Sequence, residues 1–186
     1  MHLPTILTLT ASLTILSGSA SAQLWTDSKD EKLPPDFKIQ GEYAGKNVGA
    51  QVIALGKGEF QAVLYPGGLP GAGWDGKNKI LMDGKLDGSK ATFVPAEGKK
   101  KYMAQSGAEF SATSKFPPQG HKAYSGSISD GVLSGKSEKG VEFSLKRIIR
   151  KSPSMGAKPP KGALVLFDAT KASMANWAGG RLDEKT

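Results

Sequence analysis

The chain has 186 residues, with 25 Lys and Arg against 17 Asp and Glu, so its formal net charge is +8. It contains no Cys and two His. This excludes a disulfide scaffold, a thiol nucleophile and Cys-based zinc or iron–sulfur sites, and it leaves almost nothing for a His-rich metal site. The 24 Gly and 11 Pro follow no collagen-like period, which indicates many turns within about one domain plus an extension.

Residues 1–22 are expected to be a signal peptide. They contain no Lys, Arg, Asp or Glu, and an apolar stretch, Leu3–Leu16, is followed by small residues that end in Ala20-Ser21-Ala22. This A-x-A pattern predicts cleavage after Ala22. The basic residue of a typical signal is missing, so either the signal is weak or the true start lies upstream. The segment is too short and too rich in Thr for a good membrane span. We therefore expect a periplasmic or extracellular protein with no integral membrane span after cleavage.

Residues 23–36 are predicted to be a flexible lead-in, and residues 37–150 a β-rich module. Within the module, short apolar runs alternate with Gly-containing turns, and no long run shows the apolar spacing of a helix. A strand spacing of about ten residues predicts an all-β fold, either an antiparallel β-sandwich or a small barrel. The expected strands are Ile39–Ala44, Ala50–Leu55, Glu59–Tyr65, Lys79–Met82, Ala91–Pro95, Tyr102–Gln105, Glu109–Thr113, Ala123–Ser129 and Val141–Ile149.

Three local patterns within the module are informative. Val141-Glu142-Phe143-Ser144-Leu145 alternates strictly between apolar and polar residues, as in a strand with one buried face. Leu55–Glu59 contains two Gly and predicts a hairpin loop. The sequence D-G-x-L-x-G occurs at residues 83–88 and again at 130–135. In each copy we expect Asp-Gly to form the tight turn of a hairpin. The repeat marks either two similar halves of one sheet or a chance similarity in a Gly-rich chain.

Residues 151–161 contain three Pro and no apolar period, so they are predicted to be a semi-rigid linker. A new apolar run, Ala163–Phe167, follows and is predicted to form one orphan strand. One strand cannot bury a core, because independent β-structure needs three or more strands. Either this strand docks on the module, or it opens a further domain of which residues 162–186 are only the beginning.

The apolar run carries a resemblance to a known family. Leu164–Lys171 followed by Trp177 is similar to the opening of the 3-keto-disaccharide hydrolase family, also called DUF1080, which typically reads L-F-D-G and then a Trp. Ala169 stands where the family usually has Gly. The resemblance implies a concanavalin-like jelly-roll fold and glycoside-type hydrolysis for the domain that begins at residue 162. Catalytic and sugar-contacting residues of such a domain would lie mostly after Thr186, so none is carried over.

Three further stretches extend the resemblance. The segment Arg150–Pro160 resembles the linker that joins an exported β-module to that domain in planctomycete-like bacterial proteins. Gly41-Glu42-Tyr43 and Tyr65–Gly76 look like the matching upstream module. The leading hypothesis is therefore an exported accessory module of a glycoside-processing protein, itself inactive. The alternatives are a stand-alone carbohydrate-binding module and a structural or interaction module of the cell envelope.

The most unusual stretch of the module is Tyr65–Gly76, which has five Gly and two Pro. Tyr65, Trp74 and Asp75 are candidate carbohydrate contacts, because an aromatic ring can stack on a sugar while a carboxylate accepts from its hydroxyls. The alternative is a structured turn whose Gly residues adopt positive φ and whose Trp caps the core. The stretch has no phosphate-binding loop motif.

No catalytic constellation emerges from the sequence. His121 lies in a Pro- and Gly-containing loop and is expected to be a surface residue. The paired carboxylates of a glycosidase must lie about 5–9.5 Å apart, and several Asp residues are explained by Asp-Gly turns. No calcium-loop motif is present. We therefore assign no metal and no cofactor, and leave any catalytic residue unknown.

Basic residues cluster at the end of the module, at Lys146, Arg147, Arg150 and Lys151. A nucleic-acid interface would spread basic residues over a face and interleave them with aromatic side chains, so nucleic acid is not an expected partner. The cluster is either a solvated strand end and linker or a contact for an anionic envelope surface.

Overall fold

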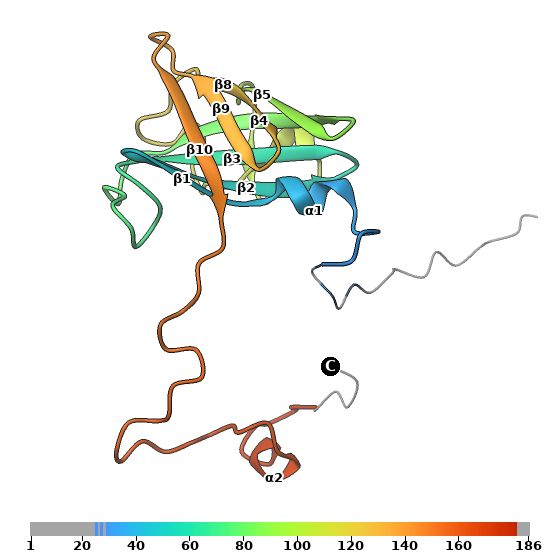
Figure 1. Ribbon diagram of the computed structural model, residues 1–186, viewed down its shortest axis with the longest axis vertical. Coiled ribbons are helices and arrows are strands. Elements are labelled where there is room, and N and C mark those ends of the chain that lie inside the picture. The colour runs from blue at the N-terminus through green and yellow to red at the C-terminus, as the bar shows by residue number, and fades with distance from the viewer. Residues whose placement is uncertain (1–24, 26, 28, 182–186) are drawn as a thin grey trace, which may run out of the picture.

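The computed structural model describes residues 25, 27 and 29–181, so the predicted signal peptide lies outside the described residues. Its centre is a closed antiparallel barrel with the strand order β1-β10-β9-β8-β5-β4-β3-β2 (Figure 1). The strands are β1 (Gly41–Gly45), β2 (Val48–Gly56), β3 (Glu59–Pro66), β4 (Ile80–Asp87), β5 (Lys90–Pro95), β8 (Ser125–Ser129), β9 (Val132–Lys136) and β10 (Glu142–Ile148). The all-β prediction is confirmed, and of its two alternatives the structure is the barrel.

The barrel strands pair mostly in chain order, so the chain runs up and down around the barrel. Closure comes from β1 and β10, which pair antiparallel from Glu42↔Ile148 to Ala44↔Lys146. The connection between β5 and β8 contains a small parallel pair, β6 (Lys101–Tyr102) and β7 (Phe110–Ser111), and a 3-10 turn at Gly107–Glu109. Two short helices flank the barrel in sequence, α1 (Pro35–Ile39) and α2 (Lys171–Met174).

Apolar side chains fill the inside of the barrel. The predicted alternation is confirmed for residues 142–145 of β10, because Leu145 is fully buried and Phe143 packs against the interior cluster, whereas Glu142 and Ser144 are exposed. Val141, the first residue of the predicted pattern, precedes the strand and is exposed. Large side chains occupy the space between the strands, as in small barrels whose interior is just wide enough for side chains. The fully buried members include Tyr43, Phe60, Phe93, Leu64, Met82, Ile128 and Leu133.

Helix α1 lies at one end of the barrel. Pro35 provides the fixed φ suited to a first helical turn, and Ile39 is 3% exposed within the interior cluster. Tyr43 donates its hydroxyl to the carbonyl of Ile39 at 2.5 Å, and burial raises the pKa of Tyr43 to about 12. Arg147 donates to the carbonyl of Gln40 at 3.1 Å. The predicted flexible lead-in therefore ends earlier than expected, at the helix.

Strand β3 is buried on both faces, because a second apolar layer covers its outside. Val63, Tyr65, Leu69, Leu81 and Ala96 form this outer cluster. The two long connections, residues 67–79 and 96–124, add Trp74, Ala112 and Phe116 to this layer, and Ala44 of β1 and Ile148 of β10 also pack against it. These connections are held on the outer face of β3 and β4.

A buried polar contact fixes the longer connection. Gln61 of β3 is fully buried and donates to the carbonyl of Phe110 at 2.9 Å and to Asp83 at 3.0 Å, while its side-chain oxygen accepts from the amide of Ala112 at 2.7 Å. Asp83 also forms an ion pair of 2.5 Å with Lys100, whose side chain is 1% exposed. We call Gln61, Asp83 and Lys100 the polar hub. It attaches β7 to the barrel wall.

Two expected strands are shorter than predicted, one strand was missed, and one predicted turn lies elsewhere. The strands expected at residues 102–105 and 109–113 are reduced to two residues each, and β9 was not predicted. In the first D-G-x-L-x-G copy, Asp83-Gly84 lies inside β4, and the chain turns after Asp87. In the second copy, Asp130-Gly131 does form the hairpin turn, with positive φ at both residues. The two copies are therefore not equivalent.

Residues 163–167 form no strand, contrary to the expectation of an orphan strand. A strand needs a neighbour that satisfies its backbone groups, and this segment has no such neighbour among the described residues. The chain leaves β10, extends away from the barrel and forms α2 apart from it (Figure 1).

Candidate functional site

The structure brings Tyr65 and Trp74 together. Tyr65 is 6% exposed, and its hydroxyl donates to the side-chain oxygen of Gln51 at 2.6 Å. Burial raises the pKa of Tyr65. Its ring meets that of Trp74 edge to face, with centroids 5.2 Å apart. This geometry is typical of an aromatic packing pair. The buried ring of Tyr65 packs under Trp74 and offers little surface to a ligand.

Trp74 is half-buried and largely engaged by its own loop. Its indole N–H donates to the carbonyl of Asn78 at 2.8 Å, and the ammonium of Lys79 lies 5.0 Å from the ring centroid. The ring also lines a surface hollow of about 390 Å³. Tyr102, Ser114 and Gln119 from the longer connection line the same hollow. A sugar at Trp74 would therefore meet these residues and not Tyr65.

Asp75 is turned back into its own loop. Its carboxylate accepts from the amides of Lys77 at 2.8 Å and Asn78 at 2.9 Å. The hydrogen bond from the Lys77 amide and those from Asn78 hold the pKa of Asp75 below its ordinary value. The Gly residues serve the same loop, since a Cβ at Gly67 or Gly68 would lie 2.3 or 2.1 Å from a backbone oxygen. The predicted residues thus form a structured turn, and their role as carbohydrate contacts stays a prediction.

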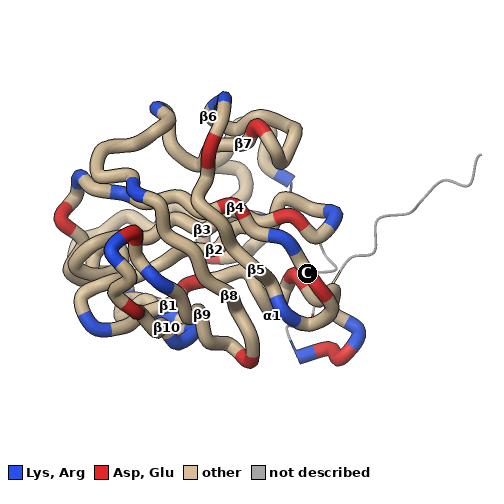
Figure 2. Tube along the Cα trace, turned by 90° about the horizontal axis from the view of Figure 1, so that it is seen from above, with Lys and Arg blue, Asp and Glu red and all other residues tan. Residues whose placement is uncertain are grey.

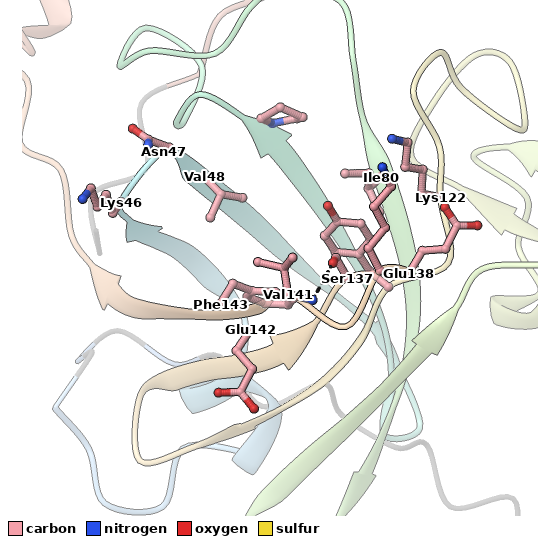
Figure 3. A pocket seen from close by; sticks show the side chains of 13 residues that line it. Lys46, Asn47, Val48, Ile80, Lys122, Ser137, Glu138, Val141, Glu142 and Phe143 are labelled. Atoms are coloured by element: carbon pink, nitrogen blue, oxygen red, sulfur yellow. Dashed lines mark hydrogen bonds between the residues drawn. The ribbon is translucent and has the colours of Figure 1, made fainter.

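The cavity that the sequence did not indicate lies at the mouth of the barrel. We use mouth for the end at which residues 46–47, 67–79, 96–124 and 137–141 connect the strands. A cavity of about 350 Å³ opens there between the strand ends. Figure 3 shows Val48, Ile80, Val141 and Phe143 gathered around it, while Glu142 points away. The mouth therefore presents an apolar recess on a barrel whose other end carries α1.

The inner wall of the recess is continuous with the barrel core. Ile80 is 3% exposed and belongs to the interior cluster, against which Val48, Tyr124 and Phe143 pack. The rings of Tyr124 and Phe143 lie 5.9 Å apart with an interplanar angle of 32°. These four elements of the wall come from β2, β4, the approach to β8 and β10. Barrel closure is what brings them together.

The β9–β10 connection shapes the outer lip of the recess. The amide of Ser137 donates to the carbonyl of Val141 at 2.8 Å, and the amide of Val141 donates to the Ser137 hydroxyl at 3.0 Å. These bonds hold Val141 at the opening although its side chain is 66% exposed. Val141 directly precedes β10, and its exposed side chain adds apolar surface where a ligand can reach it.

Charged residues surround the opening. Lys46, Lys122 and Lys139 line it, and we call them the rim lysines. All three are exposed, and none forms an ion pair with another described residue. Two acids, Glu138 and Glu142, also lie at the opening.

Two of the four basic residues predicted to contact an anionic surface instead bind groups within the protein. Arg147 binds the carbonyl of Gln40, and Arg150 binds both oxygens of Glu42 at 2.6 and 2.5 Å and the carbonyl of Pro70 at 2.8 Å. The hydrogen bonds from Arg150 hold the pKa of Glu42 below its ordinary value. Lys146 and Lys151 are exposed. Figure 2 shows both signs of charge interspersed along the turns.

His121 is not the surface residue expected from the sequence. Its Nδ1 accepts from the amide of Leu81 at 3.2 Å, which leaves Nε2 to donate to the carbonyl of Ala96 at 3.0 Å. The ring also lies 5.4 Å from that of Phe116. His121 therefore joins the longer connection to β4, a role that a Pro- and Gly-rich loop sequence does not reveal.

Within residues 25, 27 and 29–181, no group of His, Asp or Glu is arranged to hold a metal ion. In the same part of the chain, no helix has the length and apolar character needed to cross a membrane. Comparisons with protein-family models, with curated proteins and with solved structures each find no match to this chain. The resemblance to the 3-keto-disaccharide hydrolase family stays a prediction, which rests on Leu164–Lys171 and Trp177.

Proposed function

We propose that residues 41–148 form a non-catalytic binding module of an exported protein, and that the mouth of the barrel is its ligand site. The observation that carries this proposal is the apolar recess on an otherwise filled barrel. Small-molecule sites are concave and mostly apolar, and barrel mouths are among their preferred places. The volume of about 350 Å³ falls within the usual range of about 300–1,000 Å³ for such sites.

The test is binding of a neutral apolar fluorophore, N-phenylnaphthylamine, to the full chain. We expect saturable fluorescence enhancement, and we expect Val141→Asp to weaken binding about tenfold, because it places a charge at the apolar lip. Val94→Asp is the matched control, since Val94 is 55% exposed on β5 and does not line the recess. If the fluorophore shows no saturable binding, or if both variants weaken its binding equally, the proposal is contradicted.

We further propose that this module is an accessory to a glycoside-processing domain of the 3-keto-disaccharide hydrolase type, joined through residues 151–161. Support comes from the segment that carries the resemblance. Ala169 stands where the family usually has Gly, and it adopts φ of 67°, the left-handed conformation that Gly favours. Trp177 donates its indole N–H to the carbonyl of Leu166 at 3.2 Å, so the two ends of the motif meet.

The exposed apolar side chains of the same segment also support an accessory arrangement. Leu164 is 83% exposed, and Val165, Leu166 and Phe167 are 47, 51 and 46% exposed. Side chains of this size are normally covered in a folded domain. A test is to express the chain joined in frame to a hydrolase domain of this family whose own opening strand has been deleted. Restored folding of that domain supports the proposal, and failure while the intact domain folds contradicts it.

A second candidate function is carbohydrate binding at the hollow beside Trp74. The observation that favours it is the pairing of Trp74 and Tyr102 with the hydroxyl of Ser114 and the amide of Gln119 around one hollow. Aromatic rings with a few polar groups are the elements of a sugar site. Tyr102→Ala is the suitable variant because Tyr102 is 55% exposed. Loss of retention on insoluble polysaccharides with unchanged unfolding supports this candidate, and unchanged retention contradicts it.

A further inference from the structure

We infer that the mouth selects a small anionic amphiphile, a ligand with a short apolar body and one carboxylate or similar acidic group. The inference rests on the proposed binding role of the mouth and adds the chemical class of the ligand. Two independent features carry it. One is the depth and lining of the recess, and the other is the balance of charge around its opening.

The lining requires an apolar ligand body. Val48, Ile80 and Val141 offer aliphatic surface, and the tilted rings of Tyr124 and Phe143 form an aromatic wall. Burying apolar ligand surface against these side chains is favourable in proportion to the area removed from water. A fully polar ligand, such as an unsubstituted sugar, would instead leave hydroxyls facing carbon atoms without hydrogen-bond partners.

The depth of the recess limits the length of that body. Ile80 lines the recess, and the next inward residue of β4, Met82, is fully buried. Leu64, which pairs with Ile80 across β3 and β4, is also fully buried. The barrel below the recess is therefore occupied by its own side chains. A short chain or one ring system fits, whereas additional methylene groups of a longer chain would remain outside.

The rim supplies the charge that would hold an acidic group. The rim lysines come from three separate segments, with Lys46 in the β1–β2 turn, Lys122 before β8 and Lys139 in the β9–β10 turn. They therefore stand around the opening on different segments of the barrel. A ligand whose apolar body enters the recess leaves its polar end among them.

The acids at the opening oppose the rim lysines only in part. Glu142 forms an ion pair of 3.3 Å with Lys136, and its side chain points away from the recess (Figure 3). Glu138 is then the acid that remains at the opening without an ion pair among the described residues. Three lysines against one carboxylate favour an anion, and the preference should weaken with added salt because the lysines are exposed.

The experiment compares ligands that share a tail and differ in the head group. Octanoate, octanol and octylammonium each compete with N-phenylnaphthylamine for the full chain. Because the probe is neutral, changes of charge on the protein act mainly on the competitors. We expect octanoate to bind about tenfold tighter than octanol, a difference of about 1.4 kcal/mol, and octylammonium to bind more weakly than octanol.

Variants then assign the preference to the rim. The combined Lys46→Gln, Lys122→Gln and Lys139→Gln variant should bind octanoate and octanol with affinities that agree within about twofold. The matched control, with Lys57→Gln, Lys85→Gln and Lys90→Gln, removes the same charge from exposed residues that do not line the recess. It should keep the full preference. Dodecanoate should bind the native chain no more tightly than octanoate.

The outcomes separate the two proposals. If the probe binds but all three head groups compete equally, the anion preference is wrong and the binding role stands. If the preference survives in the rim variant or disappears in the control, the rim lysines do not recognise the ligand and the inference is overturned. If dodecanoate binds much more tightly, the limit on ligand length is wrong. If neither probe nor competitor binds, the binding role fails and the inference fails with it.

Discussion

Replacing Gln61 by Leu tests how the long β5–β8 connection is attached to the barrel. Leu has a similar size and suits a strand interior, so the change removes hydrogen bonds without creating a large cavity. Three bonds of Gln61 are lost, those to Asp83, to the carbonyl of Phe110 and from the amide of Ala112. Asp83 retains its ion pair with Lys100. The backbone groups of Phe110 and Ala112 lose the partner that Gln61 provided.

The cost follows from those two backbone groups. A buried donor or acceptor left without a partner costs about 1–3 kcal/mol, so the pair contributes about 2–6 kcal/mol. The greater apolar surface of Leu recovers about 1–2 kcal/mol. We therefore expect Gln61→Leu to lower the free energy of unfolding by about 3 kcal/mol. That is a large fraction of the stability of a typical domain, about 5–15 kcal/mol.

Urea unfolding followed by circular dichroism and tryptophan fluorescence measures this change. Gln105→Leu is the matched control, because Gln105 lies exposed in the same connection and should change the unfolding free energy by less than about 0.5 kcal/mol. Trypsin gives a local readout, since Lys99 and Lys100 directly precede β6 and Lys101 belongs to it. Their cleavage should be faster in Gln61→Leu. If both variants unfold like the native chain, Gln61 does not attach the connection and the reasoning is refuted.

Three further changes test other contacts. Glu42→Gln should destabilise the barrel at pH 7, and the difference should fade on acidification towards about pH 3, as measured by urea unfolding. The reason is that Arg150 holds the folded pKa of Glu42 below its ordinary value of 4.5. The stability contributed by ionised Glu42 is therefore fully present above pH 4.5 and is lost as the pH falls through the folded pKa. Trp74→Ala should lower the free energy of unfolding by about 2 kcal/mol, measured by thermal unfolding. The loss is smaller than for a fully buried Trp, because the ring is half-buried against Tyr65. An unchanged unfolding midpoint would show that this packing does not stabilise the barrel. Gly49→Ala should lower the free energy of unfolding in urea by about 1–3 kcal/mol, since a Cβ there would lie 2.6 Å from the amide nitrogen of Leu69. Unchanged stability would mean that the 67–79 connection moves aside to accommodate the methyl group.

The sequence predicted those strands whose own residues alternate or form a continuous apolar run. Val141–Leu145 and Glu59–Tyr65 are of this kind, and they correspond to β10 and β3. Strand β9 was missed because its residues are small or polar, apart from Val132 and Leu133. It is a strand because β8 and β10 lie on both sides of it. Pairing, not local propensity, determines such an element.

The mouth could not be predicted for a related reason. Its wall joins Val48, Ile80, Tyr124 and Phe143, which lie far apart in the sequence and meet only when the barrel closes. Trp74, in contrast, stood out by composition, since an aromatic residue beside a carboxylate in a Gly-rich loop suggests a sugar contact. The structure shows that those Gly residues let the loop backbone approach itself closely. Local sequence therefore indicated a turn better than it indicated a site.

The polar contacts on the outside of the barrel also explain why the mouth is open. The connections 67–79 and 96–124 both start and end at the mouth, and either is long enough to cover it. Instead, Gln61 and His121 attach the longer connection to the outer face of β3 and β4, and the amide of Lys79 donates to the carbonyl of Gln119 at 2.9 Å, which joins the two connections there. Loosening them by Gln61→Leu should therefore change N-phenylnaphthylamine binding at the mouth, although Gln61 itself does not line the recess. Unchanged binding with a loosened connection would mean that the strand ends alone keep the mouth open.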